Sequence, residues 1–218
     1  MSQKNTQEYW DTVYKKVDTV LGPTLFVKKV STYFSPPKHI LDVCCGDGKD
    51  SLYFATLGYT VTATDISAVA LFDNLQKNNL DIERIQSDVR ELVLDANIYD
   101  VVYSCLGLHY FSWEETKKIF ANLVQSLKLD GYICVRVKSI YDADYGKGEK
   151  QEGNLFISNR KQRYFFSKEE MEKLFFENNI EIICSEYVED VLKRFDKTEY
   201  TANFVDIIGK KLMNNTLY

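Results

Sequence analysis

One strand–helix–strand stretch constrains the fold of this chain more than any other feature. Residues 39–45 (HILDVCC) form an apolar, strand-like run that ends in a Gly-Asp-Gly turn. Residues 50–57 then have the pattern of a helix, and residues 59–66 (YTVTATDI) alternate like a β-branched strand. A helix that connects two consecutive strands predicts a right-handed crossover and therefore a parallel sheet.

The rest of the chain continues the alternation of strands and helices. Further strands are expected at residues 83–86, 99–105, 132–138, 180–188 and 201–210, and helices at residues 6–17, 67–77, 112–127 and 167–178. The charged stretch between the last two strands favours an antiparallel hairpin at a sheet edge. We therefore predict an α/β fold: a Rossmann-like three-layer sandwich with a mostly parallel seven-stranded sheet and an antiparallel C-terminal strand.

Length and composition predict one ordinary globular domain. The 218 residues carry no repeat or linker, so residues 1–218 are expected to form a single domain, with residues 1–35 as an N-terminal helical cap. The polar, glycine-bearing segment 141–165 is long for a connection and is predicted to be a substrate lid.

Charge and cysteine usage limit the partners that we expect. The net charge of −5 disfavours a nucleic-acid partner, and no apolar run is long enough to span a membrane. Five cysteines without C-x-x-C spacing, and two isolated histidines, predict neither disulfides nor a metal site. A cytoplasmic protein, either a monomer or a homodimer, is the simplest interpretation.

Two acidic residues indicate the kind of ligand. Asp65 ends the second strand, where an acid accepts hydrogen bonds from the ribose of an adenosine ligand. Asp42 precedes the glycine turn, and its carboxylate would repel the pyrophosphate of a dinucleotide. The same carboxylate suits an ammonium or a sulfonium group, which together with adenosine points to S-adenosylmethionine.

The stretch from Asp42 to Gly48, followed by Asp65, resembles motif I of the class I S-adenosylmethionine-dependent methyltransferases. Residues 46–59 (GDGKDSLYFATLGY) are more narrowly similar to the tellurite-resistance branch of small-molecule methyltransferases. The resemblance implies methyl transfer to a small molecule. It also implies cofactor contacts from Asp42, Cys44, Gly46, Gly48, Asp65, Ile66, Asp88, Val89, Ser104, Tyr14 and Trp10.

One residue departs from the family pattern. Cys44 stands where the family usually has its first glycine, and its side chain is expected to crowd the methionine end of the cofactor.

The acceptor site is predicted from residues that follow the fourth and fifth strands. His109 is the candidate general base, with a satisfied loop histidine as the alternative. Arg136 and Lys138 share one face of a strand, so they are candidates to anchor an anionic substrate group, unless they pair with an acid of the lid. Tyr110 and Tyr145 are the remaining candidates for substrate contact.

Two other functions stay open on the sequence. A nicotinamide-dependent (NAD) oxidoreductase would use the glycine turn and Asp65, although Asp42 argues against it. A non-catalytic S-adenosylmethionine-binding protein would explain the altered glycine at Cys44.

Overall fold

The computed structural model describes residues 3–16, 22–36, 38–71, 80–158, 161–193 and 198–212. Its helices are α1 (Gln3–Tyr14), α2 (Leu25–Val30), α3 (Lys49–Thr56), the 3-10 helix η3 (Leu108–Tyr110), α4 (Trp113–Ser126) and α5 (Lys168–Glu177). Its strands are β1 (His39–Val43), β2 (Thr60–Asp65), β3 (Ile82–Gln86), β4 (Tyr99–Cys105), β5 (Leu127–Lys138), β6 (Glu149–Lys150), β7 (Leu155–Ser158), β8 (Lys161–Tyr164), β9 (Ile180–Lys193) and β10 (Glu199–Lys211).

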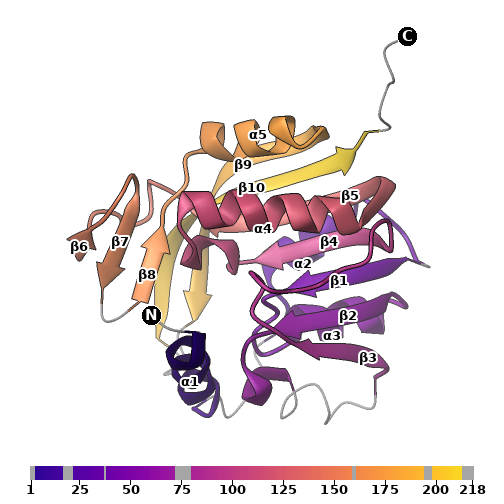
Figure 1. Cartoon of the computed structure of the whole chain (residues 1–218), viewed down its shortest axis with the longest axis horizontal. Helices are drawn as coiled ribbons and strands as arrows, with labels where there is room; N and C mark the ends of the chain where they lie inside the picture. Colours follow the sequence, from indigo (N-terminus) through magenta and orange to yellow (C-terminus); the bar gives the residue numbers. More distant parts are fainter. Residues whose placement is uncertain are drawn as a thin grey trace.

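Seven strands form one sheet in the order β3-β2-β1-β4-β5-β10-β9 (Figure 1). Strands β1 to β5 pair in parallel, whereas β10 is antiparallel to both β5 and β9. This order confirms the predicted mostly parallel sheet with an antiparallel last strand. Because β1 and β4 lie centrally and are buried on both faces, they read as continuous apolar runs in the sequence.

Helices cover both faces of this sheet and bury two separate cores. One core lies under α4 and α5 and includes Phe120, Leu123 and Phe175. The other lies under α2 and α3 and includes Phe26 and Phe54. In Figure 1, α4 and α5 lie in front of the sheet, and α2 and α3 lie behind it. The three-layer arrangement follows from these two apolar faces.

Helix boundaries were the best-defined local signals. Ser112 and Glu115 form a capping box at the start of α4, and Ser167 and Glu170 form one at the start of α5, which agrees with the predicted helix starts at residues 112 and 167. Gly58, with φ 88°, follows the last turn of α3 as expected for a residue that must adopt a left-handed conformation.

Several predicted boundaries differ from the structure. Strand β5 begins at Leu127 rather than residue 132, and β9 continues to Lys193 rather than residue 188. The segment expected to be a loop from residue 141 to 165 contains a second sheet of three antiparallel strands, β6-β7-β8. Residue 17 of the first predicted helix and residues 72–77 of the second lie outside the described residues.

The small sheet and α1 lie at the same end of the large sheet. Figure 1 shows both beside the carboxyl ends of the parallel strands, where open α/β sheets bind their ligands. Within the described part of the chain, no helix is long and apolar enough to cross a membrane.

Candidate active site

A cavity of about 700 Å³ opens at the carboxyl ends of β1, β2 and β4. This volume lies within the range that small-molecule and cofactor sites occupy. The glycine turn and the ends of β2 and β4 line one part of the cavity. Helix α1, η3, the small sheet and the loop after β3 line other parts. The cavity therefore joins the cofactor motif of the sequence to elements that are far away along the chain.

Asp42 forms the floor of the cavity at the end of β1. Its side chain is buried, and Ser51 at the start of α3 donates a hydrogen bond to Oδ2 at 2.5 Å. Burial raises the pKa of Asp42 to about 8, and the nearby carboxylates Asp50, Asp65 and Asp47 add to the rise. The site thus holds a buried carboxyl group whose ionised form a cationic ligand would stabilise.

The turn after β1 bends through three left-handed residues. Cys44, Gly46 and Gly48 have φ angles of 57°, 59° and 74°. A Cβ on Gly46 would lie 2.6 Å from the hydroxyl oxygen of Tyr14, so glycine is needed there for packing as well as for conformation. Gly48 is the N-cap of α3 and does not line the cavity.

Cys44 keeps the left-handed backbone that a glycine would adopt and directs its side chain toward Gly107. A Cβ on Gly107 would lie 2.6 Å from Cys44 Cβ and 3.1 Å from Cys44 Sγ. The side chain also lines the cavity. Gly107, which follows β4, has no side chain and therefore leaves room for the side chain of Cys44.

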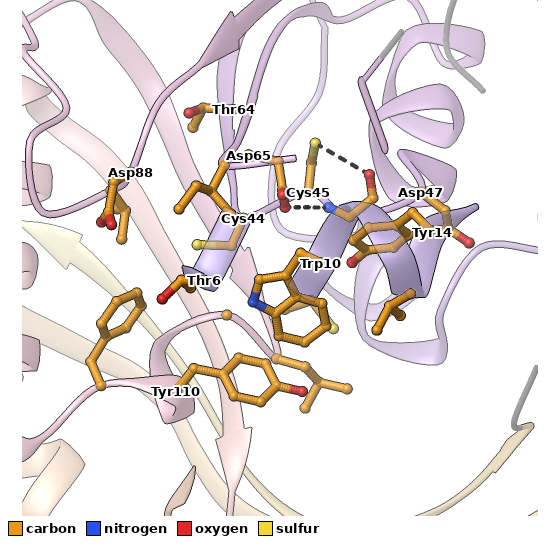
Figure 2. Close-up of a pocket in the computed structure, with 18 of the residues that line it drawn as sticks. Thr6, Trp10, Tyr14, Cys44, Cys45, Asp47, Thr64, Asp65, Asp88 and Tyr110 are labelled. Carbon is orange, nitrogen blue, oxygen red and sulfur yellow. Dashed lines mark hydrogen bonds between the residues drawn. The ribbon is translucent and has the colours of Figure 1, made fainter. Parts of the chain in front are cut away.

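Asp65 ends β2 and lies against the glycine turn. Its Oδ2 accepts a hydrogen bond from the Gly46 amide at 3.0 Å (Figure 2). Its Oδ1 accepts one from the Ser67 amide at 2.9 Å. Burial raises the pKa of Asp65 to about 6. The neighbouring Thr64 Oγ1 also lines the cavity and is buried without a hydrogen-bond partner. A buried orphan hydroxyl next to a carboxylate is consistent with a site that a polar ligand completes.

Asp88 follows β3 and is held by Arg90. The Arg90 guanidinium donates to both carboxylate oxygens, at 3.0 and 2.6 Å. Although burial opposes it, Arg90 lowers the pKa of Asp88 below its usual value. Figure 2 shows Asp88 at one side of the cavity and Asp47 at the other, with Asp65 between them. Ile66 and Val89 complete this acidic half of the cavity.

Aromatic side chains from two elements close the opposite wall. Trp10 and Tyr14 of α1 stack with ring centroids 5.9 Å apart, and Trp10 meets Tyr110 of η3 edge-on at 4.9 Å. In Figure 2 Trp10 lies near the middle of the view, beside Tyr14 and above Tyr110. The predicted residues Trp10, Tyr14 and Tyr110 are thus brought together.

Several cavity residues were not predicted from the sequence. They come from the loop before α2, from the first turn of α3, and from β4, β8 and β10: Thr24, Lys49, Asp50, Tyr103, Lys161, Gln162, Arg163 and Tyr200. Asp50 accepts hydrogen bonds from the Thr24 amide and hydroxyl and from the Tyr103 hydroxyl. Lys161 and Arg163 lie two residues apart on β8 and therefore share a face of the strand. A sequence prediction of a strand at residues 161–164 would have indicated this shared face.

Arg136 and Lys138 have partners inside the protein and do not line the cavity. Arg136 donates to Asp206 at 2.6 and 2.9 Å and to Asp190 at 2.9 Å. Lys138 donates to Asp142 at 2.6 Å. The prediction that they anchor a substrate anion is therefore corrected: both are paired, and Lys138 pairs with an acid of the lid segment.

His109 and Tyr145 also lie outside the cavity lining. His109 is buried behind Tyr110, and its Nδ1 has no hydrogen-bond partner. Burial, with the charges of Arg163, Lys138 and Lys161, lowers the pKa of His109 well below its usual value. Tyr145 packs edge-on against Phe156 of β7 and against Phe165, which follows β8. Neither placement supports the predicted role of base or substrate contact.

Ser104 is directed into the protein rather than into the cavity. Its hydroxyl donates to the Val43 carbonyl oxygen at 3.2 Å. The next three residues, Cys105, Leu106 and Gly107, line the cavity instead. Leu106 has a φ of 62°, so the chain turns sharply after β4 and presents backbone to the site.

Comparisons with known proteins agree with this geometry. Residues 40–131 match a family described as methyltransferase domain. Over 99 residues the chain is 31% identical to the probable S-adenosyl-L-methionine-dependent methyltransferase TehB of Haemophilus influenzae, covering 44% of this chain and 34% of that protein. The chain thus spans about a third of the length of this curated relative.

Two solved structures share the fold over nearly the whole chain. TehB of Haemophilus influenzae aligns over 94% of this chain and 66% of that one, with a TM-score of 0.66 and 18% identity. The 1,6-didemethyltoxoflavin-N1-methyltransferase of Burkholderia thailandensis, solved with its acceptor and S-adenosylhomocysteine, aligns over 97% and 84%, with a TM-score of 0.67 and 18% identity. By the sequence of residues 40–131 the chain matches the methyltransferase domain family, and its fold and sequence resemble those of TehB, a probable S-adenosylmethionine-dependent methyltransferase.

Proposed function

We propose that this chain binds S-adenosylmethionine in the acidic half of the cavity and transfers its methyl group to a small-molecule acceptor. When bound, the cofactor supplies an activated methyl group on a sulfonium. The acceptor would attack this methyl carbon in line with its bond to sulfur, and that bond would break to release S-adenosylhomocysteine. The protein's main contribution would be to hold the acceptor and the methyl group at reacting distance.

The observation that carries the proposal is the set of carboxylates around the glycine turn. Asp42, Asp47, Asp50 and Asp65 all line the same part of the cavity. This cluster suits the positively charged methionine end and opposes the pyrophosphate of a dinucleotide. It therefore favours the methyltransferase over the NAD-dependent oxidoreductase.

Each part of the cofactor would meet a particular group of this chain. Asp42 would neutralise the charge of the methionine end, and Gly46 would let the backbone approach it closely. Asp65, with Thr64 beside it, would accept hydrogen bonds from the ribose. Val89 would pack on the adenine. The Arg90 guanidinium already donates to both carboxylate oxygens of Asp88. We therefore propose that Asp88 fixes this loop and also contacts the adenine.

The acceptor would lie on the far side of the methyl group, between α1, η3 and the small sheet. Trp10 and Tyr110 would shield it from water. We retain the lid role for segment 141–165, in which β8 and Ile157 of β7 line the cavity. No general base is assigned, because His109 lies outside the lining. Thiolate, chalcogen and other acceptors that need no base are compatible with this arrangement.

A binding and turnover experiment tests this function. S-adenosylhomocysteine and NAD are titrated separately while the melting temperature is measured, and a metabolite panel is then incubated with methyl-labelled S-adenosylmethionine. We expect stabilisation by S-adenosylhomocysteine alone and label transfer to at least one metabolite. Stabilisation by NAD alone would contradict the proposal, and tight cofactor binding without any transfer would favour a non-catalytic binding protein.

A further inference from the structure

The cavity has a basic wall opposite its acidic floor. Strand β8 lines it with Lys161 and Arg163, and Gln162 between them donates from Nε2 to the Tyr110 carbonyl oxygen at 2.7 Å. This hydrogen bond joins the small sheet to η3. The two cations, which we call the basic wall, are thus held beside the aromatic side chains that close the cavity.

Lys161 is a half-buried cation without a carboxylate partner. Its Nζ lies 4.8 Å from the ring centroid of Trp10, 5.3 Å from that of Tyr9 and 5.4 Å from that of Tyr110. Among the described residues, no carboxylate oxygen lies within 4.0 Å of this Nζ. Burial, with the charge of Arg163, lowers the pKa of Lys161 to about 8. The rings compensate for only part of the hydration that this ammonium has lost.

Arg163 contributes a second incomplete set of donors. Its Nε is buried and has no hydrogen-bond partner, while its Nη1 donates to the half-exposed Asp144 at 3.3 Å. Burying a donor of a charged group without a partner is unfavourable, so the position of Nε calls for an acceptor.

The local charge is also unbalanced. Besides burial, Lys138, Lys161 and Arg163 all act on the nearby His109, so three cations gather in this corner. Asp142 pairs with Lys138 and Asp144 with Arg163. Among the described residues, the charge of Lys161 is left without such a partner.

We infer that the basic wall binds an oxyanion, a carboxylate or a phosphate, carried by the methyl acceptor; this inference rests on the proposed function. An oxyanion between Lys161 Nζ and Arg163 Nε would accept charge-assisted hydrogen bonds from both. The rest of the acceptor would then lie against Trp10 and Tyr110. If the wall served only to hold α1 on the small sheet, an uncharged side chain in place of Lys161 would do so without the cost of burying an ammonium.

Tryptophan fluorescence gives a direct readout at this wall. The chain has two tryptophans, so Trp113→Phe leaves Trp10, which lies against Lys161, as the sole emitter. In this background we titrate 4-hydroxybenzoate and phenyl phosphate, the neutral isostere 4-hydroxyacetophenone, and inorganic phosphate. Each titration is run with and without saturating S-adenosylhomocysteine.

We expect at least one organic anion to bind at least about tenfold more tightly than both the neutral isostere and inorganic phosphate. Lys161→Met and Arg163→Met should each remove most of this preference and leave the affinity for S-adenosylhomocysteine unchanged. The matched control is Lys150→Met, because Lys150 is an exposed lysine of the same small sheet and does not line the cavity. It should bind every probe as the parent does.

Other outcomes overturn the inference. They are equal binding of the neutral and anionic probes, no binding of any anion, binding of inorganic phosphate as tightly as of phenyl phosphate, or an equal loss in Lys150→Met. If Lys161→Met weakens the binding of S-adenosylhomocysteine as much as that of the anions, the basic wall only maintains the structure of the cavity and the inference is wrong. Anion binding in a protein that does not bind S-adenosylhomocysteine would instead overturn the proposed function, so the two failures are distinguishable.

Discussion

At the scale of single residues, the pKa of Asp42 lies well above the usual value for a carboxyl group. Burial raises it to about 8, so the group is mostly protonated at neutral pH in the cofactor-free protein. A cationic ligand favours the ionised form. Binding of such a ligand should therefore release a proton from this site.

We predict that the affinity for S-adenosylhomocysteine rises by up to about tenfold per pH unit between pH 6.5 and 8, because one proton leaves Asp42 on binding. Asp42→Asn should remove this slope and weaken binding most at pH 8. Isothermal titration calorimetry in two buffers of different ionisation enthalpy measures the proton release directly. An affinity independent of pH in the parent protein would contradict the assignment of Asp42.

Cys44 and Gly107 are a second residue-scale feature with a measurable consequence. A Cβ on Gly107 would lie 2.6 Å from Cys44 Cβ, and Gly107 itself has an ordinary φ of −92° that alanine can adopt. We predict that Gly107→Ala costs about 1–3 kcal/mol of unfolding free energy in the parent protein. In a Cys44→Gly background the cost should be markedly smaller, because the 2.6 Å contact is then gone and the close neighbour that remains is Ser104 Oγ, at 3.1 Å.

A double-mutant cycle by chemical denaturation measures this coupling. Gly22→Ala serves as the control, because a Cβ on Gly22 would meet no atom within 4 Å. Effects of Cys44→Gly and Gly107→Ala that add to within about 0.5 kcal/mol would show that the two positions do not compete for the same space.

At the scale of elements, Arg136 fixes β5 against β10 and β9. It donates to Asp206 and Asp190, and its guanidinium lies about equally far from the rings of Phe26 and Phe204, at 5.1 and 5.0 Å. Asp206 faces it across the antiparallel pairing of β5 and β10. The cation therefore joins three strands at the end of the sheet.

We predict that Arg136→Met lowers the free energy of unfolding by about 3–5 kcal/mol, because it leaves Asp190 without this cation and leaves the buried Asp206 with only Lys29, at 3.8 Å. The affinity for S-adenosylhomocysteine and the KM for an acceptor should stay unchanged. Lys117→Met, which removes a solvent-exposed pair with Glu114, should change stability by less than about 1 kcal/mol. A raised acceptor KM with unchanged stability would restore the role in substrate binding that the sequence predicted.

The elements differ in how well the sequence specifies them. The capping boxes of α4 and α5 are local signals, so both helices were predicted at nearly their observed start. The strands of the small sheet are short: β6 has two residues, and β7 and β8 have four each. Their pairing depends on partners that the local sequence does not reveal. The segment from residue 141 to 165 was therefore predicted as a loop.

At the scale of the whole molecule, buried acids couple stability to pH. The pKa of Asp42 is about 8 in the folded chain, whereas an unfolded aspartate titrates near 3.8. The folded chain therefore binds more protons at Asp42 than the unfolded chain between these values. Its stability falls as the pH rises across that interval. The half-buried His39 and the buried His109 have lowered pKa values and act in the opposite direction, but only below about pH 6.5.

We predict that the melting temperature of the cofactor-free protein falls between pH 6.5 and 8. The slope from Asp42 is at most about 1.4 kcal/mol per pH unit. Asp42→Asn should flatten the curve, and saturating S-adenosylhomocysteine should do the same. Differential scanning calorimetry over this range checks the sign. A melting temperature that rises toward pH 8 in the parent protein would count against an Asp42 pKa near 8.

The sequence by itself determined the cofactor half of this protein. A buried strand, a glycine turn and an acid at the end of the next strand are contiguous in the chain, and each has a local physical reason for its residue type. The tertiary structure decided the other half. Pairing with Asp206 and Asp142 withdrew Arg136 and Lys138 from the cavity, and the fold of β8 placed Lys161 and Arg163 there instead. The charge of a side chain is written in the sequence, but its partner depends on which distant strands become neighbours.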